Sequence, residues 1–201
     1  MAVNYMENGT LPKPAPINAF NKAGSTVIGE GDTMVLPDIP ATIFEGEAEL
    51  GLVIGKRAKN VPASEAMDYI FGYTCFIDGS ARGLPEGGFP TMKSRYTFAP
   101  IGPWLLTADE AANPNNLHMW LEVNGVRKQD NSTKDMIYNC ATIISNLSKT
   151  LTLYPGDIIF TGTPQGVAYG EKNPKYLRAG DVVTMGIEGL GEQRNKCVAY
   201  K

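Results

Sequence analysis

The segment IFEGEAELGLVIGK, residues 43–56, carries the strongest indication of fold and chemistry in this chain. Three glutamates, Glu45, Glu47 and Glu49, occupy alternate positions, and a hydrophobic run follows directly. In a β-strand, side chains alternate between two faces, so the three carboxylates would project from one side, about 6–7 Å apart. Like charges at that spacing repel each other, and burial beside an apolar segment adds a desolvation cost. A strand here therefore needs something that neutralises this face.

The rest of the chain predicts a β-rich fold, because 22 glycines and 14 prolines separate many short runs of alternating polarity. Strands are expected within residues 20–37 (two short strands around a glycine-rich turn), 47–56, 73–82 (running into a loop), 115–125, 156–166 and 180–200. Residues 1–20 are rich in proline and are expected to form an extended arm, with a single domain over residues 21–201. The predicted fold class is α+β, predominantly β.

Two segments predict helices. Pro62 followed by ASEAMDYIFGY indicates a helix that begins near Ala63, with Ala66, Met67 and Ile70 on its buried face. The segment TKDMIYNCATIISNLSKTLTL, residues 133–153, is the better candidate, because its apolar residues fall at helical spacing. Those apolar residues are Met136, Ile137, Cys140, Ile143, Ile144 and Leu147.

Composition narrows the possible functions and locations. A formal net charge of −3 and the absence of polybasic segments give no footprint for nucleic acid or for an anionic membrane. No apolar stretch approaches the roughly 20 residues of a transmembrane helix, and the first residues lack secretory features. Cys75, Cys140 and Cys197 are odd in number and far apart, which predicts reduced core thiols in a cytoplasmic protein.

The single histidine limits the mechanisms further. His118 alternates with apolar residues in a run that ends at the turn Asn124-Gly125, which predicts a strand with this histidine on its wetter face. A Ser-His-Asp or Cys-His mechanism would have to use that residue. Zinc sites built from several histidines are excluded.

Carboxylates offer a different chemistry. Hard divalent cations such as Mg²⁺ or Ca²⁺ bind carboxylate oxygens, and Mg²⁺ usually keeps waters that a substrate can displace. Two glutamates on one strand face and an aspartate from another segment would suit such an ion, and Asp78 in CFIDGSAR is the best third ligand. From spacing alone, a solvated acidic strand face is the competing interpretation.

Four stretches in order resemble the fumarylacetoacetate hydrolase family, over about residues 17–200. They are EAELGLVIGK, GYTCFIDGSARG, KSRYTFAPIGPWLLT, and GDIIFTGTPQGV closing with GDVVTMGIEGLGEQRN. The resemblance implies a mixed β-roll with a few flanking helices, which forms a homodimer. It also implies Mg²⁺ or Mn²⁺, with Ca²⁺ as another option, bound by Glu47, Glu49 and Asp78. The ion would then neutralise two of the three glutamates.

The family acts on small-molecule 2-oxo acids and 1,3-dicarbonyl compounds, by C–C hydrolysis, decarboxylation or keto-enol tautomerisation. All three reactions build negative charge on an oxygen beside the reacting carbon, and a bound cation stabilises that enolate. The resemblance implies catalytic roles for Lys93, Thr163 and Arg82. Lys93 would be a cation beside the substrate or, alternatively, a surface lysine. Arg82 has a structural alternative, holding a buried carbonyl or carboxylate, and Lys22 also sits at a family-like position.

Further substrate contacts are implied by the same resemblance. The TGTP run supplies Thr161 and Gly162 beside the substrate, where Gly162 permits close approach of the backbone. Thr163 in that run would donate its hydroxyl to a substrate carboxylate. Gln129 is a weaker candidate for a substrate contact. Thr133 would either cap the long helix, the favoured interpretation, or reach the substrate.

The chain also departs from the family pattern. The family's N-terminal NY-x-x-H-x-x-E lid begins at Asn4-Tyr5, but no histidine follows, and Glu7 stands too close to match. Gly83 and the pair Arg95-Tyr96 replace acidic or aromatic family residues near the pocket. Hydrolysis needs an activated water, so the missing pair favours decarboxylation or tautomerisation, with Tyr96 as a substitute proton donor.

Two other functions stay open from the sequence. One is a family member that has lost catalysis and binds a ligand or partner. The other is a Schiff-base aldolase that uses Lys93 or Lys22 with a depressed pKa and no metal.

Overall fold

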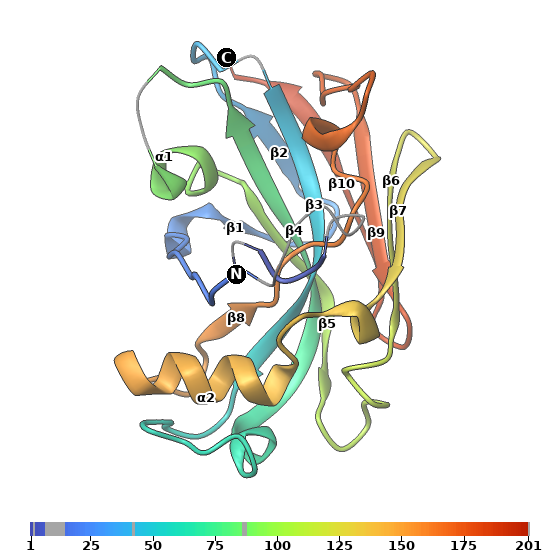
Figure 1. The fold of residues 1–201 in the computed structure, drawn as a ribbon. Helices are drawn as coiled ribbons and strands as arrows, with labels where there is room; N and C mark the ends of the chain where they lie inside the picture. Colours follow the sequence, from blue (N-terminus) through green and yellow to red (C-terminus); the bar gives the residue numbers. More distant parts are fainter. Residues whose placement is uncertain (2, 7–14, 42, 86–87, 201) are drawn as a thin grey trace.

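The computed structural model describes residues 1, 3–6, 15–41, 43–85 and 88–200, and there the chain forms two five-stranded sheets (Figure 1). The first sheet has the order β1-β5-β4-β3-β8 and the second the order β2-β10-β9-β6-β7. Each sheet is mixed, because β1 runs parallel to β5 and β2 runs parallel to β10. The strands are β1 (Val27–Ile28), β2 (Thr33–Leu36), β3 (Ile43–Ile54), β4 (Ile70–Arg82), β5 (Ala99–Thr107), β6 (His118–Val123), β7 (Val126–Ser132), β8 (Ile158–Phe160), β9 (Val182–Ile187) and β10 (Gly191–Ala199).

Helices are few and short, which confirms the predicted α+β, predominantly β class. They are α1 (Phe89–Lys93), α2 (Cys140–Thr150) and the 3₁₀ turns η1 (Gly24–Thr26), η2 (Ala66–Tyr69), η3 (Thr133–Asp135) and η4 (Ala168–Gly170). In Figure 1, α1 flanks the upper part of the first sheet and α2 lies below β8. No helix in the described ranges combines the length and apolar character needed to cross a membrane.

The pairing of β3 with β4 places the glutamates. The two strands are antiparallel, and their register sets three pairs side by side: Glu45↔Ser80, Glu47↔Asp78 and Glu49↔Phe76. Because side chains alternate along a strand, these six share one face of the first sheet, called the site face below. The intervening pairs Ala48↔Ile77 and Leu50↔Cys75 point to the opposite face. The observed register therefore places the three glutamates on one face of the sheet, as the sequence predicts.

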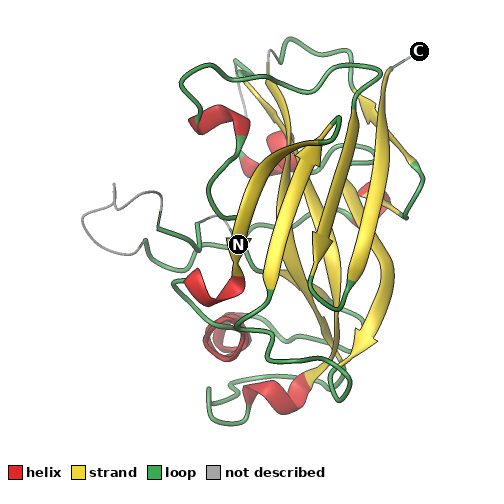
Figure 2. Cartoon of the chain, turned by 90° about the vertical axis from the view of Figure 1, so that its right-hand side faces the viewer, coloured by secondary structure: helices red, strands yellow, loops and turns green. Residues whose placement is uncertain are grey.

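The opposite face of the first sheet packs on the second sheet and forms the core. At Gly46, an added Cβ would lie 3.1 Å from Ile77 and 3.5 Å from Val183, so the two sheets come close together there. Figure 2 shows the second sheet face-on, its strands running side by side along the molecule. Fully buried side chains from both sheets fill the interface: Leu50, Leu52, Cys75, Ile77, Met119, Leu121, Val183 and Met185.

The three cysteines lie in this interior, as predicted. Cys75, Cys140 and Cys197 are buried free thiols. Burial raises the pKa of each thiol to about 12, because a thiolate in the core would lose its hydration. They are core residues and not ligands of the candidate site described below.

The predicted helix from Ala63 is wrong. Only the 3₁₀ turn η2 forms there, and β4 begins at Ile70, directly after it. The run from Ile70 is rich in β-branched and aromatic residues, which favour a strand, and Ile70 pairs with Ile54 of β3. Ile70, which helical spacing assigns to the buried face of a helix, therefore belongs to a strand because it pairs with β3.

The long helix predicted over residues 133–153 is shorter than expected. It begins at Cys140, where the Asn139 side chain caps it by accepting a hydrogen bond from the Thr142 N–H (2.9 Å). Upstream, Met136 pairs with Tyr5, and the Ile137 N–H donates to Asn4 O (2.7 Å). These long-range bonds compete with a continuous helix and keep residues 136–139 out of it.

Thr133 does not cap that helix, so the favoured interpretation of this residue was wrong. Its hydroxyl accepts a hydrogen bond from the Leu117 N–H (2.8 Å), and Ser132 precedes the separate turn η3. A substrate contact from Thr133 stays a prediction.

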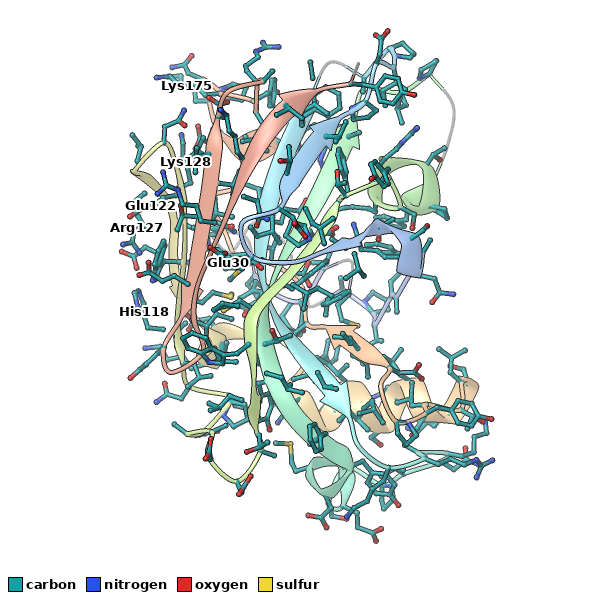
Figure 3. All side chains as sticks on the ribbon, turned by 180° about the vertical axis from the view of Figure 1, so that it is seen from behind. Glu30, His118, Glu122, Arg127, Lys128 and Lys175 are labelled. Atoms are coloured by element: carbon teal, nitrogen blue, oxygen red, sulfur yellow. The ribbon has the colours of Figure 1, made fainter. Side chains whose placement is uncertain are left out.

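His118 lies on the second sheet in the environment predicted for it. Its side chain is about half exposed and pairs with Asp130 of β7. Figure 3 shows His118 with Glu122, Arg127 and Lys128 along one edge of the molecule, on the side away from α1 and α2. The histidine is therefore remote from the glutamates of β3.

Candidate active site

Three carboxylates converge on the site face. Glu47 and Glu49 come from β3 and Asp78 from β4, and each offers an oxygen within 4.8 Å of the others. All three are buried, with exposed fractions of 5%, 1% and 2%. The sequence grouped these residues by alternation and resemblance, and the β3–β4 register brings them together.

Lys93 lies inside this cluster. Its ammonium donates to Glu47 Oε1 (2.7 Å) and to Asp78 Oδ2 (2.7 Å) from the end of α1. Burial alone would lower the pKa of Lys93, but the carboxylates of Asp78 and Glu47 outweigh it and raise the pKa. The alternative of a surface lysine is therefore wrong, since this charged side chain is only 4% exposed.

Lys22 reaches the other oxygen of Asp78. Its Nζ donates to Asp78 Oδ1 (2.6 Å) and to the carbonyl oxygen of Lys93. Burial lowers the pKa of Lys22, and Asp78 opposes that change. Conversely, burial would raise the pKa of Asp78, but Lys93 and Lys22 lower it overall. The aspartate is thus held ionised between two ammonium groups.

Arg82 links Glu45, the third glutamate of β3, to the carboxylate cluster. Its guanidinium donates to Glu45 Oε1 and, through Nη2, to Glu47 Oε1 (2.9 Å). Ser80 adds a hydrogen bond to the same Glu47 oxygen (3.0 Å). Arg82 thus holds buried carboxylates, which is the structural role considered for it, and its catalytic role stays a prediction.

These contacts answer how the glutamate strand is tolerated. Four carboxylates, those of Glu45, Glu47, Glu49 and Asp78, face three side-chain cations. Counted over side chains alone, the formal balance is one net negative charge, so side-chain cations offset most of the repulsion expected from the sequence. Among the described residues, Glu49 is the member of the cluster with no side-chain cation bonded to it.

Glu49 is held by backbone from the TGTP run. The Gly162 N–H donates to Glu49 Oε2 (2.6 Å), and Gly162 has a φ of 93° that favours glycine. An added Cβ at Gly162 would lie 2.9 Å from the Cβ of Asn4, so close backbone approach is required there. Burial raises the pKa of Glu49 to about 8.

Thr163 and Gln129 lock this run onto β3. The Thr163 hydroxyl donates to Ala48 O (2.8 Å) and accepts a hydrogen bond from Gln129 Nε2 (2.8 Å). Gln129 Oε1 accepts from the Ala48 N–H (2.8 Å). Both side chains therefore position the loop in this structure. Their contacts with a substrate stay predictions.

Asn4 is a site residue whose role the sequence did not reveal. Its Nδ2 donates to Thr161 O (2.7 Å) and Tyr138 O (3.0 Å), while its Oδ1 accepts from the Tyr138 N–H (2.8 Å). It is fully buried and ties the TGTP run to the segment before α2. The Asn4-Tyr5 pair, noted only as the start of an incomplete lid motif, was the available signal.

Two buried hydroxyl groups near Glu49, Thr161 Oγ1 and Tyr5 Oη, are unpaired in the described part of the chain. The Glu49 carboxylate contributes, after burial, to raising the pKa of Tyr5, which reflects their proximity. Buried polar groups are normally paired, so these two hydroxyls are exceptions, and neither residue lines the cavity described below.

The donor set fits a hard divalent cation. Glu47, Glu49 and Asp78 supply only carboxylate oxygens, the ligand type that Mg²⁺, Mn²⁺ and Ca²⁺ prefer. Among the described residues, Glu49 has no side-chain cation bonded to it, and the Met1 amino group is a positive group near it, so a metal ion bound here would add its charge beside Glu49. Lys93 already bonds to two of the three carboxylates, so a metal ion would share those groups with it.

A cavity of about 480 Å³ opens beside the cluster and is lined by residues of β1, β8 and the C-terminal end of α2. In Figure 1, β8 lies between β1 and α2. Lys22, Glu49 and Asp78 line it, so the cluster faces a space large enough for a small substrate. Phe76 and Phe160 also line it and stack with their ring centroids 3.4 Å apart. Lys93 does not line it, so Lys22 is the lysine that faces the cavity.

The residues at which the chain departs from the family pattern lie elsewhere. Tyr96 is 71% exposed and does not line the cavity, so the structure gives no support to it as a proton donor. Arg95 Nε donates to Thr91 O (2.6 Å) on the surface. Gly83 directly follows β4 and has a φ of 77°, which explains a glycine after Arg82. Glu7 lies outside the described residues.

Comparisons with known proteins agree with this geometry. Residues 2–198 match the family model described as fumarylacetoacetate (FAA) hydrolase C-terminal. The 2,4-didehydro-3-deoxy-L-rhamnonate hydrolase of Sphingomonas sp. (strain SKA58) is 43% identical, covering 100% of this chain and 73% of its own.

Solved structures give the same result. Maleylpyruvate hydrolase from Sphingobium sp. SYK-6, in complex with manganese (II) ion and pyruvate, has a TM-score of 0.86 and 34% identity, covering 100% of this chain and 69% of its own. 5-Carboxymethyl-2-hydroxymuconate delta-isomerase from Mycobacterium smegmatis has a TM-score of 0.87 and 33% identity, covering 100% and 77%. Hydrolases and isomerases thus share this fold.

Proposed function

Because the chain belongs to the fumarylacetoacetate hydrolase family, we propose that it is a divalent-metal-dependent enzyme that acts on a 2-oxo acid or β-dicarbonyl substrate through an enolate. One observation carries the proposal: Glu47, Glu49 and Asp78 converge beside a cavity that Lys22 also faces. Such a site places carboxylate ligands and a lysine cation around one small molecule. The manganese and pyruvate complex of the Sphingobium relative supports the same chemistry.

Glu47, Glu49 and Asp78 would hold the metal ion. A divalent ion bound there supplies a Lewis acid that stabilises negative charge on an enolate oxygen. Mg²⁺ or Mn²⁺ is proposed, with Ca²⁺ as the less favoured ion. A cytoplasmic homodimer remains the expectation from the family.

The chain's own residues bind and orient the substrate. Lys22 presents its positive charge to the cavity and would attract a substrate carboxylate. Lys93 bridges Glu47 and Asp78 and so fixes the two carboxylates relative to each other, a positioning role. The stacked rings of Phe76 and Phe160 exclude water from part of the cavity, which strengthens the electrostatic interactions beside them.

The TGTP run completes the site. The Gly162 N–H holds Glu49 in place, and Thr163 with Gln129 anchors the run to β3. The buried hydroxyl of Thr161 has no hydrogen-bond partner among the described residues but does not line the cavity, so a contact with the substrate would need the run to move. These residues therefore belong to the binding machinery, even where their hydrogen bonds are now made to the protein.

Among the three family reactions, decarboxylation or tautomerisation suits the site better than hydrolysis. Hydrolysis needs a group that activates water, and no histidine is present among the described residues that line the cavity. The names of the relatives include both hydrolases and isomerases, so both classes enter the test. The alternative function is a catalytically impaired member of the family that binds a small ligand or partner.

Proton NMR of oxaloacetate and of an acylpyruvate in D₂O with Mg²⁺ tests the proposal. One series of spectra separates deuterium exchange at C3, loss of CO₂ and C–C cleavage. We expect acceleration of at least one process over the metal-only control. The acceleration should be lost in Glu49→Gln and kept in Glu122→Gln, a matched change on β6 far from the site.

Two results would contradict the proposal in different ways. Full activity of Glu49→Gln would show that the site is assigned to the wrong residues. Failure of the unmodified protein to accelerate either compound, while still binding a 2-oxo acid with Mg²⁺, would favour the binding-only alternative.

A further inference from the structure

The polarity of the cavity changes along its length. Lys22, Glu49 and Asp78 form its charged end. The amino group of Met1 lies near Glu49 and donates a hydrogen bond to Phe160 O (2.8 Å), so it belongs to the same end. Much of the remaining wall is apolar and includes Phe76, Ile101, Leu147, Leu151, Ile158 and Phe160.

Strand register gives the cavity a direction. Along β3, Glu49 is followed on the same face by Gly51, which pairs with Phe160, and by Val53, which pairs with Ile158. Four residues of β-strand span roughly 13 Å, so Ile158 lies about that far from Glu49 along the sheet. The wall therefore runs from the carboxylates, past the stacked rings, to an apolar far end.

The far end offers nothing that would bind a second negative charge. Lys22 supplies the only side-chain cation among the described residues that line the cavity. Asp157 directly precedes Ile158 and adds a carboxylate at the exposed rim, where it accepts a hydrogen bond from the Tyr154 N–H (2.7 Å). A substrate carboxylate placed there would lose hydration and face a like charge.

We propose that the substrate carries its 2-oxo acid group at the Lys22 end and an uncharged apolar group toward Leu147 and Leu151. The enzyme then selects monocarboxylates with an alkyl or aryl tail and rejects dicarboxylates of the same length. This specificity rests on the proposed function for the placement of the 2-oxo acid. The tail preference itself follows from the wall of the cavity.

Two unreactive analogues test the tail preference by calorimetry with Mg²⁺ present. N-propyloxamate and N-(2-carboxyethyl)oxamate share the 2-oxo acid mimic and differ in whether the chain ends in methyl or carboxylate. We expect the propyl compound to bind at least about tenfold more tightly, because its tail contacts apolar side chains. Equal or tighter binding of the carboxyethyl compound, or no binding of either, would overturn the inference.

A substitution at the far end should change the preference. Leu151 lies at the C-terminal end of α2 and is 49% exposed, so Leu151→Lys is compatible with the fold and with the helix dipole. We expect this variant to bind the carboxyethyl compound about two- to fivefold more tightly and the propyl compound more weakly. Val126→Lys, at the start of β7 and 59% exposed, is the control and should change neither.

Turnover separates this inference from the proposed function. The matched pair is 2,4-dioxoheptanoate, which ends in methyl, and 2,4-dioxoheptanedioate, which ends in carboxylate. Faster turnover of the first supports both proposals, whereas faster turnover of the second overturns only the tail preference. Tighter binding of the propyl analogue without turnover of either substrate would refute the proposed function and leave the tail preference supported.

Discussion

β3 and β6 carry polar side chains at alternate positions but place them in opposite environments. On β3, Glu45, Glu47 and Glu49 are buried, with at most 5% exposure. On β6, the alternate residues are His118, Trp120 and Glu122, which are exposed or partly exposed. Figure 3 shows His118 and Glu122 along one edge of the molecule. The same period of two therefore gives an enclosed acidic cluster in one sheet and an ordinary wet surface in the other.

The difference comes from what covers each face. Residues around Lys22, the helix α1 and the loop after β8 bring their groups onto the site face formed by β3 and β4. On the outer face of β6, Arg127 lies 4.3 Å from the centre of the Trp120 ring and bonds to Glu122 (3.1 Å), while remaining 40% exposed. Burial makes each ionic contact on β3 costly to break, because no water replaces the lost partner.

Removing a cation should show the largest contrast between these two regions. Lys93→Met leaves Glu47 and Asp78 buried with one partner fewer, and we expect it to lower the free energy of unfolding by about 3–5 kcal/mol. Arg127→Met removes an exposed partner and should cost less than about 1 kcal/mol. Urea unfolding in EDTA measures both, and equal losses would refute the contrast.

Removing a carboxylate should lower metal affinity on β3 but not on β6. Glu49→Gln deletes a proposed ligand while its side chain can still accept the Gly162 N–H. We expect Mn²⁺ affinity to fall about 100-fold, by electron paramagnetic resonance titration. Glu122→Gln makes the same chemical change on β6 and should leave the affinity unaltered. If Glu49→Gln changes the Mn²⁺ affinity only slightly, Glu49 is not a metal ligand.

The TGTP run should tolerate a methyl group poorly. Gly162→Ala adds both a positive-φ penalty and contact with Asn4, so we expect a loss of roughly 2–3 kcal/mol. Gly156→Ala has a similar φ of 92° but meets no atom within 4 Å, and should cost about 1 kcal/mol. Thermal and urea unfolding test this pair. Equal losses would mean that the Asn4 contact contributes nothing.

The three buried thiols should not react with a disulfide reagent while the protein is folded. Their pKa is raised from 9.0 to about 12 by burial, so the neutral form is favoured in the fold. That contribution to stability is complete below about pH 9 and is lost as the pH rises toward 12. At pH 8 we expect no reaction with a disulfide reagent in the folded protein and three thiols after denaturation. Rapid labelling of the folded protein would contradict this.

Periodicity was sufficient where one face of a segment meets a single environment. Alternation located β3 and placed its three glutamates on one side, and β6 with His118 followed the same rule. It failed for residues 63–70 and 136–139, where pairing with β3, Asn4 or Tyr5 overrides helical spacing. Local patterns carry no information about such distant partners.

The sequence by itself determined the strand of glutamates, the buried thiols and, through its ordered motifs, the family and the candidate ligands Glu47, Glu49 and Asp78. Only the tertiary structure decided how their charge is balanced. Lys22, Lys93 and Arg82 are up to 56 residues away from their carboxylate partners, and Asn4 is 157 residues from Thr161. Electrostatic and hydrogen-bond energies depend on distance and burial in space, and neither quantity can be read from positions along the chain.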